Sequence, residues 1–128
     1  MTCILGFDFG QKRTGVAIAI DGDAQPLATL DADTISADIP KLISKHRPSE
    51  LVVGIPRNLD GEETTQTKLS RAFGEQLASL TKLPVKYQDE ALSSQRALQR
   101  IGENTPIATR KKILDQVSAQ IILEDYLK

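Results

Sequence analysis

Short apolar runs alternate with polar, turn-forming segments along the 128 residues, and this pattern predicts most of the secondary structure. Five segments have the length of β-strands, and the first four are rich in Val, Ile, Leu and Ala. The run at 50–55 is almost continuously apolar, which is typical of a strand buried on both faces. The predicted strands are residues 2–9, 14–20, 26–30, 50–55 and 84–88, and the last of them ends at Asp89 and Glu90.

Four other segments are predicted to be helical. The clearest is 64–81, because its apolar residues recur at helical spacing: Leu69, Phe73, Leu77 and Leu80. A short helix is predicted at 38–45, with Asp38 as its cap and Pro40 in its first turn. A further short helix is expected from Ser93 or Ser94 to about Gly102. After a polar loop at 103–109, the last helix is expected over about 110–127.

The order of these elements indicates an α/β fold. Three consecutive strands form an antiparallel meander, and later strands separated by helices add parallel partners. We therefore expect a mixed five-stranded sheet with helices on both faces and right-handed crossovers. The chain has no internal repeat or linker, so residues 1–128 are predicted to form one domain. This strand and helix order resembles the ribonuclease H-like fold.

Charge and cysteine content narrow the possible settings. The formal net charge is −1, and the stretch 21–38 contains five aspartates and no Lys or Arg. Basic residues cluster elsewhere, so a polyanion would be met by one face only. The single cysteine, Cys3, excludes a disulfide framework and favours a reducing, cytoplasmic setting. No apolar run approaches membrane-spanning length, and we expect no membrane partner.

Three acidic positions stand where chemistry would use them. Asp8 ends the first strand and is followed by a glycine-bounded turn, Glu90 with its neighbour Asp89 ends the last strand, and Asp115 lies in the first turns of the predicted last helix. Converging carboxylates repel one another unless a cation holds them. Mg²⁺ or Mn²⁺, as one or two ions, would activate water for phosphodiester hydrolysis without a side-chain nucleophile.

Each of these acids also has a purely structural interpretation. Asp8 would bond nearby backbone amides in a turn. Asp89 and Glu90 would simply solvate a strand end. Asp115 would pair with Lys111 or Lys112 on the helix surface. Taken together and in this strand order, the three acids favour a metal site.

Four segments in this order resemble the YqgF family, also called RuvX, over nearly the whole chain. The family comprises bacterial proteins described as Holliday-junction resolvases and associated with maturation of the 5′ end of pre-16S ribosomal RNA. The matching segments are GFDFGQKRTGVA at 6–17, VGIPRNLDG at 53–61, DE at 89–90 and DQVSAQIILEDYL at 115–127.

The resemblance implies a ribonuclease H-like nuclease whose catalytic and metal-binding carboxylates are Asp8, Glu90 and Asp115. It also implies phosphate contacts from neighbouring residues: Lys12, Arg13, Arg57, Asn58, Arg110 and Lys112. The residues at 110–112 would act at the positive end of the last helix. Ala91 stands where the family typically has arginine, so one phosphate or carboxylate contact is absent here.

Three functions follow as hypotheses. The first is a metal-dependent nuclease acting on structured RNA, with pre-16S rRNA as the expected substrate, or on branched DNA. The second is a non-catalytic module that binds nucleic acid or a ribosome-assembly partner. The third is a nucleotide-binding phosphotransferase, for which the chain is too short to form two domains around a cleft. A Holliday-junction resolvase would require a symmetric dimer, and the sequence leaves monomer and homodimer open.

Overall fold

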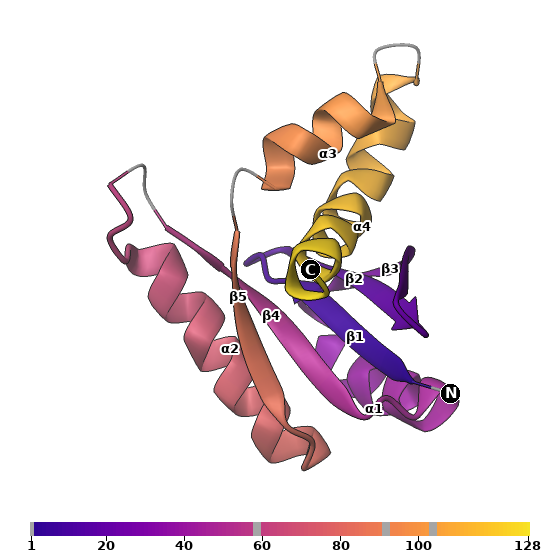
Figure 1. Ribbon diagram of the computed structural model, residues 1–128, viewed down its shortest axis with the longest axis vertical. Coiled ribbons are helices and arrows are strands. Elements are labelled where there is room, and N and C mark those ends of the chain that lie inside the picture. Colours follow the sequence, from indigo (N-terminus) through magenta and orange to yellow (C-terminus); the bar gives the residue numbers. More distant parts are fainter. Residues whose placement is uncertain (1, 58–59, 91–92, 103–104) are drawn as a thin grey trace.

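The computed structural model describes residues 2–57, 60–90, 93–102 and 105–128, excluding the side chains of 93, 94, 111 and 112 (Figure 1). Its centre is a five-stranded mixed sheet in the order β3-β2-β1-β4-β5. The strands are β1 (Cys3–Asp8), β2 (Arg13–Ile20), β3 (Asp23–Asp31), β4 (Glu50–Pro56) and β5 (Val85–Glu90). The first three are antiparallel neighbours, and β4 and β5 continue parallel to β1. The predicted meander and parallel extension are confirmed.

Helices cover both faces of this sheet, as predicted. The helices α1 (Ile35–His46) and α2 (Thr65–Thr81) lie on one face, and α4 (Ile107–Tyr126) crosses the other (Figure 1). The short helix α3 (Ser93–Ile101) packs on α4 through a small cluster of Ala97, Val117 and Ile121. The α/β class and the ribonuclease H-like arrangement are both confirmed.

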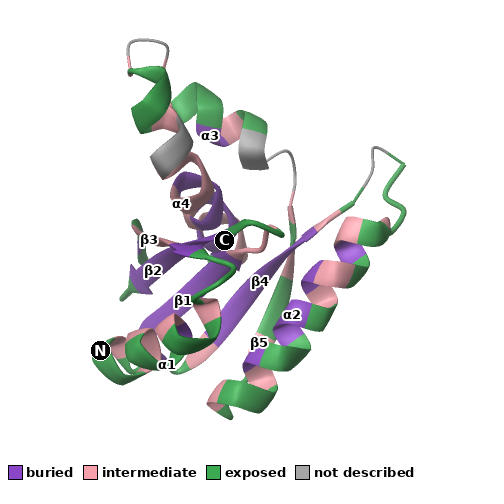
Figure 2. Cartoon of the chain, turned by 180° about the vertical axis from the view of Figure 1, so that it is seen from behind, coloured by how far each residue is buried: buried purple, intermediate pink, exposed green. Residues whose placement is uncertain are grey.

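Alternation along the strands sends side chains to two separate cores. In β1, Leu5 and Phe7 are fully buried and pack with Phe73 of α2. The intervening position Ile4 packs instead with Ile122 of α4. Figure 2 shows this burial concentrated in the central strands. Because side chains alternate between faces, Asp8 faces α4, on the same side of the sheet as Ile4.

Glycines allow α4 to lie very close to the sheet. A Cβ on Gly15 would collide with the backbone carbonyl of Asp115, and a Cβ on Gly54 would collide with Ile122. Such interior strand glycines mark close approach by another element. Hydrogen bonds from Gln116 to Thr29 (3.1 Å) and from Gln120 to the Ala24 carbonyl (3.0 Å) fix α4 over β3. The backbone of α4 is therefore held firmly over the strand ends.

Two predicted helix starts are wrong. The helix α1 begins at Ile35 rather than Asp38, so Pro40 lies in its second turn and Asp38 receives a hydrogen bond from the Thr34 hydroxyl (2.8 Å). The helix α4 begins at Ile107, after Pro106. An extended proline is compatible with the residue before a helix, and the apolar Ile107 was assigned to a polar loop. The helix α2 begins at Thr65, within one residue of the prediction, and Thr64 caps it in a reciprocal capping box with Thr67.

Within the described ranges, the helices are all too short or too polar to cross a bilayer.

Candidate active site

Asp8 and Glu90 meet where β1 and β5 end. Asp8 is the last residue of β1 and lies opposite Gly15 of β2, and Glu90 is the last residue of β5, beside Pro56 of β4. Gly54 makes room for the Glu90 side chain, because a Cβ there would lie 2.9 Å from Glu90 Cγ. Burial is the largest reason that the pKa of Asp8 lies well above its usual range, followed by the charge of Glu90 and a hydrogen bond with it. The two carboxyls thus form a pair that does not hold two negative charges comfortably.

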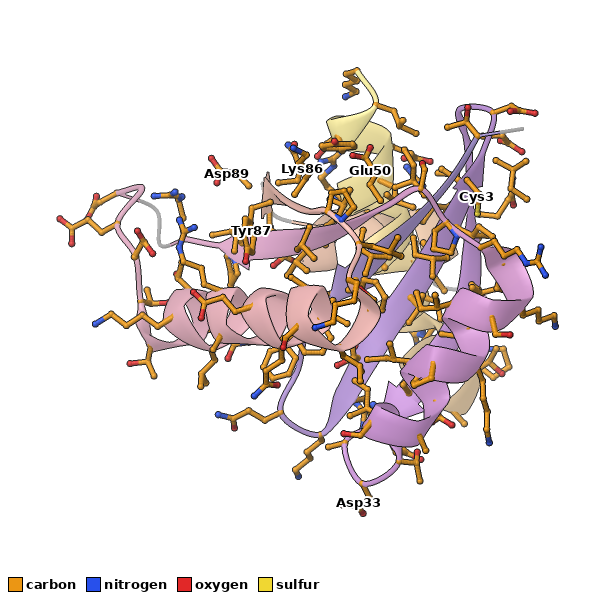
Figure 3. The ribbon with its side chains drawn as sticks, turned by 90° about the horizontal axis from the view of Figure 1, so that it is seen from below. Cys3, Asp33, Glu50, Lys86, Tyr87 and Asp89 are labelled. Atoms are coloured by element: carbon orange, nitrogen blue, oxygen red, sulfur yellow. The ribbon has the colours of Figure 1, made fainter. Side chains whose placement is uncertain are left out.

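Of the two adjacent acids at the end of β5, Glu90 faces this site and Asp89 does not. Figure 3 shows two earlier residues of the same strand, Lys86 and Tyr87, projecting to opposite sides of β5. The Tyr87 hydroxyl donates to the Arg71 carbonyl of α2 (3.4 Å). Asp89 instead accepts a hydrogen bond from Arg57 Nε (3.1 Å). Glu90 therefore remains a candidate site residue, whereas Asp89 has a structural role as the partner of Arg57.

Asp115 lies near the pair but its carboxylate is bound elsewhere. Its charge is one of the causes that raise the pKa of Asp8, so the two groups are within electrostatic reach. Its Oδ2 accepts a hydrogen bond from Arg13 Nε at 3.2 Å. The side chains of Lys111 and Lys112, the partners considered from the sequence, lie outside the described residues. Because α4 begins at Ile107, Asp115 sits in the third helical turn and not in the first turns as predicted.

As positioned, the acids do not form a complete cation site. Among the residues that the structure describes, no three His, Cys, Asp or Glu side chains stand together closely enough to hold a metal ion. Two carboxylates are adjacent, and the third is turned toward Arg13. The chemistry of this set nevertheless fits Mg²⁺ or Mn²⁺, because a hard cation binds carboxylate oxygens and would relieve the repulsion between Asp8 and Glu90.

The predicted phosphate-binding residues differ in their surroundings. Lys12 and Arg13 are exposed in and after the turn that follows Asp8. Arg57 is held by Asp89 and by the Gly61 carbonyl (3.2 Å). Arg110 is partly buried, and its backbone N–H donates to the Pro106 carbonyl, so it does not offer the free amide of a helix start. Asn58, Ala91 and the side chain of Lys112 lie outside the described residues.

The remaining residues of special chemistry have structural surroundings. Cys3 is only 7% exposed, and burial raises the pKa of its thiol, which disfavours the reactive thiolate. His46 lies in the last turn of α1, where a positive charge is favourable. Sequence reasoning overlooked Gly15 and Gly54. Their signal was available, because each is a glycine within a strand and next to β-branched apolar residues, Val16 in β2 and Val53 and Ile55 in β4.

The fold and its acidic strand ends define a ribonuclease H-like protein with a carboxylate site on the α4 face. The family model described as "RuvX: Holliday junction resolvase" matches residues 2–128, and the chain belongs to this family. A protein of Methylobacillus flagellatus is 45% identical, over 97% of this chain and 89% of its own. One of Dechloromonas aromatica is 40% identical, over 100% and 92%. Both carry the name "Putative pre-16S rRNA nuclease".

A solved structure supports the fold independently. The chain superposes on Thermus thermophilus RuvC, solved in complex with a Holliday junction substrate, with a TM-score of 0.60. The match covers 98% of this chain and 94% of that one at 15% identity. At that identity the likeness establishes the shared fold and says nothing about substrate.

Proposed function

We propose that this protein is a metal-dependent nuclease that hydrolyses phosphodiester bonds of structured nucleic acid, with the 5′ end of pre-16S rRNA as its substrate. The observation that carries the proposal is the partly buried Asp8–Glu90 pair at the strand ends, in a family whose members are named for this substrate. Buried like charges are costly, and a carboxylate pair of this kind is what a cation site requires.

Asp8, Glu90 and Asp115 would hold one or two Mg²⁺ or Mn²⁺ ions. A bound cation supplies an activated water and stabilises the leaving oxygen of the phosphodiester. Lys12 and Arg13 would orient the backbone phosphates beside Asp8, because both are exposed in the turn between β1 and β2 or at its end. Arg57 and Arg110 extend this positive border, and Asn58 and Lys112 are proposed to join it.

Cleavage of two substrates tests the proposal. Purified protein is incubated with Mn²⁺ and either an RNA carrying the 5′ leader of 16S rRNA or a four-way DNA junction. We expect cleavage of the RNA, loss of cleavage in EDTA, and loss in Asp8→Asn and Glu90→Gln. Asp23→Asn is the matched control, because Asp23 is exposed at the start of β3, at the end of the sheet opposite Asp8. Equal cleavage by wild type and Asp8→Asn would contradict the proposed role of Asp8.

The same experiment separates the other hypotheses. Preferred cleavage of the DNA junction would favour a resolvase and, since two strands must be cut, a symmetric dimer. RNA binding that weakens with salt but is never followed by cleavage, with any divalent metal, would favour a non-catalytic module. We propose a cytoplasmic role in ribosome maturation, and we therefore expect the RNA and not the DNA junction to be cut.

A further inference from the structure

The contact between Arg13 and Asp115 joins residues 102 positions apart, one at the start of β2 and the other in the third turn of α4. Arg13 Nε lies 3.2 Å from Asp115 Oδ2, and the two side chains are 52% and 23% exposed. An ion pair with this exposure stabilises a protein by only about 0–1 kcal/mol. The contact therefore engages Asp115, the third acid of the site, and breaking it costs little free energy.

Arg13 uses only part of its guanidinium in this pair. Its contact is made through Nε alone, and its terminal nitrogens make no hydrogen bond to any residue that the structure describes. By contrast, Arg96 grips both oxygens of Asp125 with both terminal nitrogens, at 2.7 and 3.2 Å. A phosphate offers arginine a two-pronged, charge-assisted contact that is stronger than a single Nε bond. Arg13 is consequently exposed and equipped to exchange Asp115 for a phosphate.

Asp115 is free to change only its side-chain direction. Its backbone touches β2 so closely that Gly15 leaves no room for a Cβ, and the next residue, Gln116, is bonded to Thr29. Its charge already acts on Asp8. Rotation of this carboxylate away from Arg13 would therefore bring it to the Asp8–Glu90 pair without any movement of α4.

We propose that Arg13 is a phosphate-operated latch on the metal site. Without nucleic acid, Arg13 holds Asp115 away from Asp8 and Glu90, and a backbone phosphate of the substrate takes Arg13 and releases Asp115 to complete the cation site. This inference rests on the proposed function and deepens it, because it makes Arg13 a positioning residue for the metal as well as a phosphate contact. It predicts that metal binding and nucleic-acid binding strengthen each other.

Calorimetric titration of Mn²⁺ tests the latch without measuring cleavage. Mn²⁺ is titrated into the protein alone and into the protein saturated with a ten-nucleotide RNA, and a titration into the RNA alone is subtracted. For wild type we expect the RNA to tighten Mn²⁺ binding by about fivefold or more, within the usual range of coupling between sites. In Arg13→Gln we expect tighter Mn²⁺ binding without RNA and less than about a twofold further gain with it.

Lys12→Gln is the matched control, since it removes the same charge from the same turn. Lys12 makes no side-chain contact with Asp115 within the described part of the chain, so this variant should keep the wild-type coupling at saturating RNA. Asp115→Asn should bind Mn²⁺ weakly and show no coupling. If Arg13→Gln keeps the coupling, or if both glutamine variants change Mn²⁺ binding equally, the latch is wrong.

The outcomes also separate the latch from the proposed function. Mn²⁺ binding that disappears in Asp8→Asn but ignores RNA in the wild type would overturn the latch and leave the proposed nuclease standing. Mn²⁺ binding that is unaffected by Asp8→Asn, or no Mn²⁺ binding by the wild type, would overturn both.

Discussion

The helix α4 contains two kinds of acidic residue, and their surroundings differ sharply. In its last turn, Asp125 and Glu124 are each gripped by both terminal nitrogens of an arginine from α3, Arg96 and Arg100 respectively. In its third turn, Asp115 accepts one hydrogen bond, from Arg13, among the side chains that the structure describes, and it adds its charge to the pair of Asp8 and Glu90. The first arrangement satisfies its charges, and the second leaves them poorly matched.

This contrast separates structural acids from candidate catalytic ones better than acidity alone. Hydrogen bonds from Arg96, and then its charge, lower the pKa of Asp125, whereas burial and neighbouring acids raise the pKa of Asp8. Pairing with an arginine stabilises the ionised carboxylate and attaches α3 to α4. An unmatched cluster lowers stability in exchange for a site where a cation binds favourably.

The largest expected difference comes from removing one acid of each kind. Asp8→Asn should reduce cleavage by at least about 100-fold. Loss of a residue that only hydrogen-bonds a metal ligand costs about 10–100-fold, and loss of the ligand itself should cost more. In EDTA, the same variant should melt at a higher temperature than wild type, since the repulsion within the pair is gone. Asp125→Asn should do the reverse, lowering the melting temperature and retaining cleavage. A lower melting temperature for Asp8→Asn would break the contrast.

Glycine replacement tests how rigidly the backbone sets the unmatched site. Gly15→Ala should destabilise the fold by about 1–3 kcal/mol, because its new methyl meets the backbone of Asp115, which cannot move without shifting α4. Gly6→Ala is the comparison, since its methyl meets only the side chain of Leu123, at 2.5–3.1 Å, which is able to rotate. Urea unfolding should rank Gly15→Ala as the more destabilising variant. The reverse order would refute backbone control of the spacing.

The two kinds of acid predict opposite pH dependence in EDTA. The folded-state pKa of Asp8 is raised, so its contribution to stability is fully present below its unfolded pKa of about 4 and is lost as the pH rises through the folded value. The folded-state pKa of Asp125 is lowered, so its contribution is present above about 4 and is lost as the pH falls. Melting temperatures from pH 3 to 8 should therefore fall less steeply above pH 4 in Asp8→Asn than in wild type. Parallel curves would contradict the raised pKa.

The smallest effect is expected within the matched end of α4. Arg96→Met should cost about 1 kcal/mol and Arg100→Met about 0.5 kcal/mol, since the Glu124 partner is 34% exposed and the Asp125 partner is 14% exposed. Methionine keeps the apolar stem of each arginine, so the loss reports the charged contact. Denaturant melts at low salt give the two values. Equal losses of unfolding free energy would show that burial of the acidic partner does not determine the strength of these ion pairs.

Much of the fold was predictable because its signals are local. The apolar run at 50–55 and the helical stripe of α2 belong to single elements, and their bounds match the structure within a residue or two. The start of α4 was missed because Ile107 follows a proline in a polar stretch. The three residues by which the helix is longer at its start, 107–109, are exposed, so no buried apolar stripe marked them as helical.

The candidate site was predictable to a different degree. The residue types and the strand ends pointed to Asp8, Glu90 and Asp115, and the structure brings the first two together. The pairing of Arg13 with Asp115 was not predictable, because it joins residues 102 positions apart and depends on the rotamers of two surface side chains. Such contacts depend on how far apart two elements lie in the folded protein, and this distance cannot be read from a single sequence.

The glycine contacts beneath α4 also bear on how this protein tolerates change over generations. Where Gly15 meets Asp115, the spacing between helix and sheet is set by main-chain atoms and not by apolar side chains. Exchanges among Val, Ile and Leu elsewhere beneath α4 therefore leave the carboxylates at the same separation. Lineages are free to vary most of this interface, provided that the points of main-chain contact stay bare.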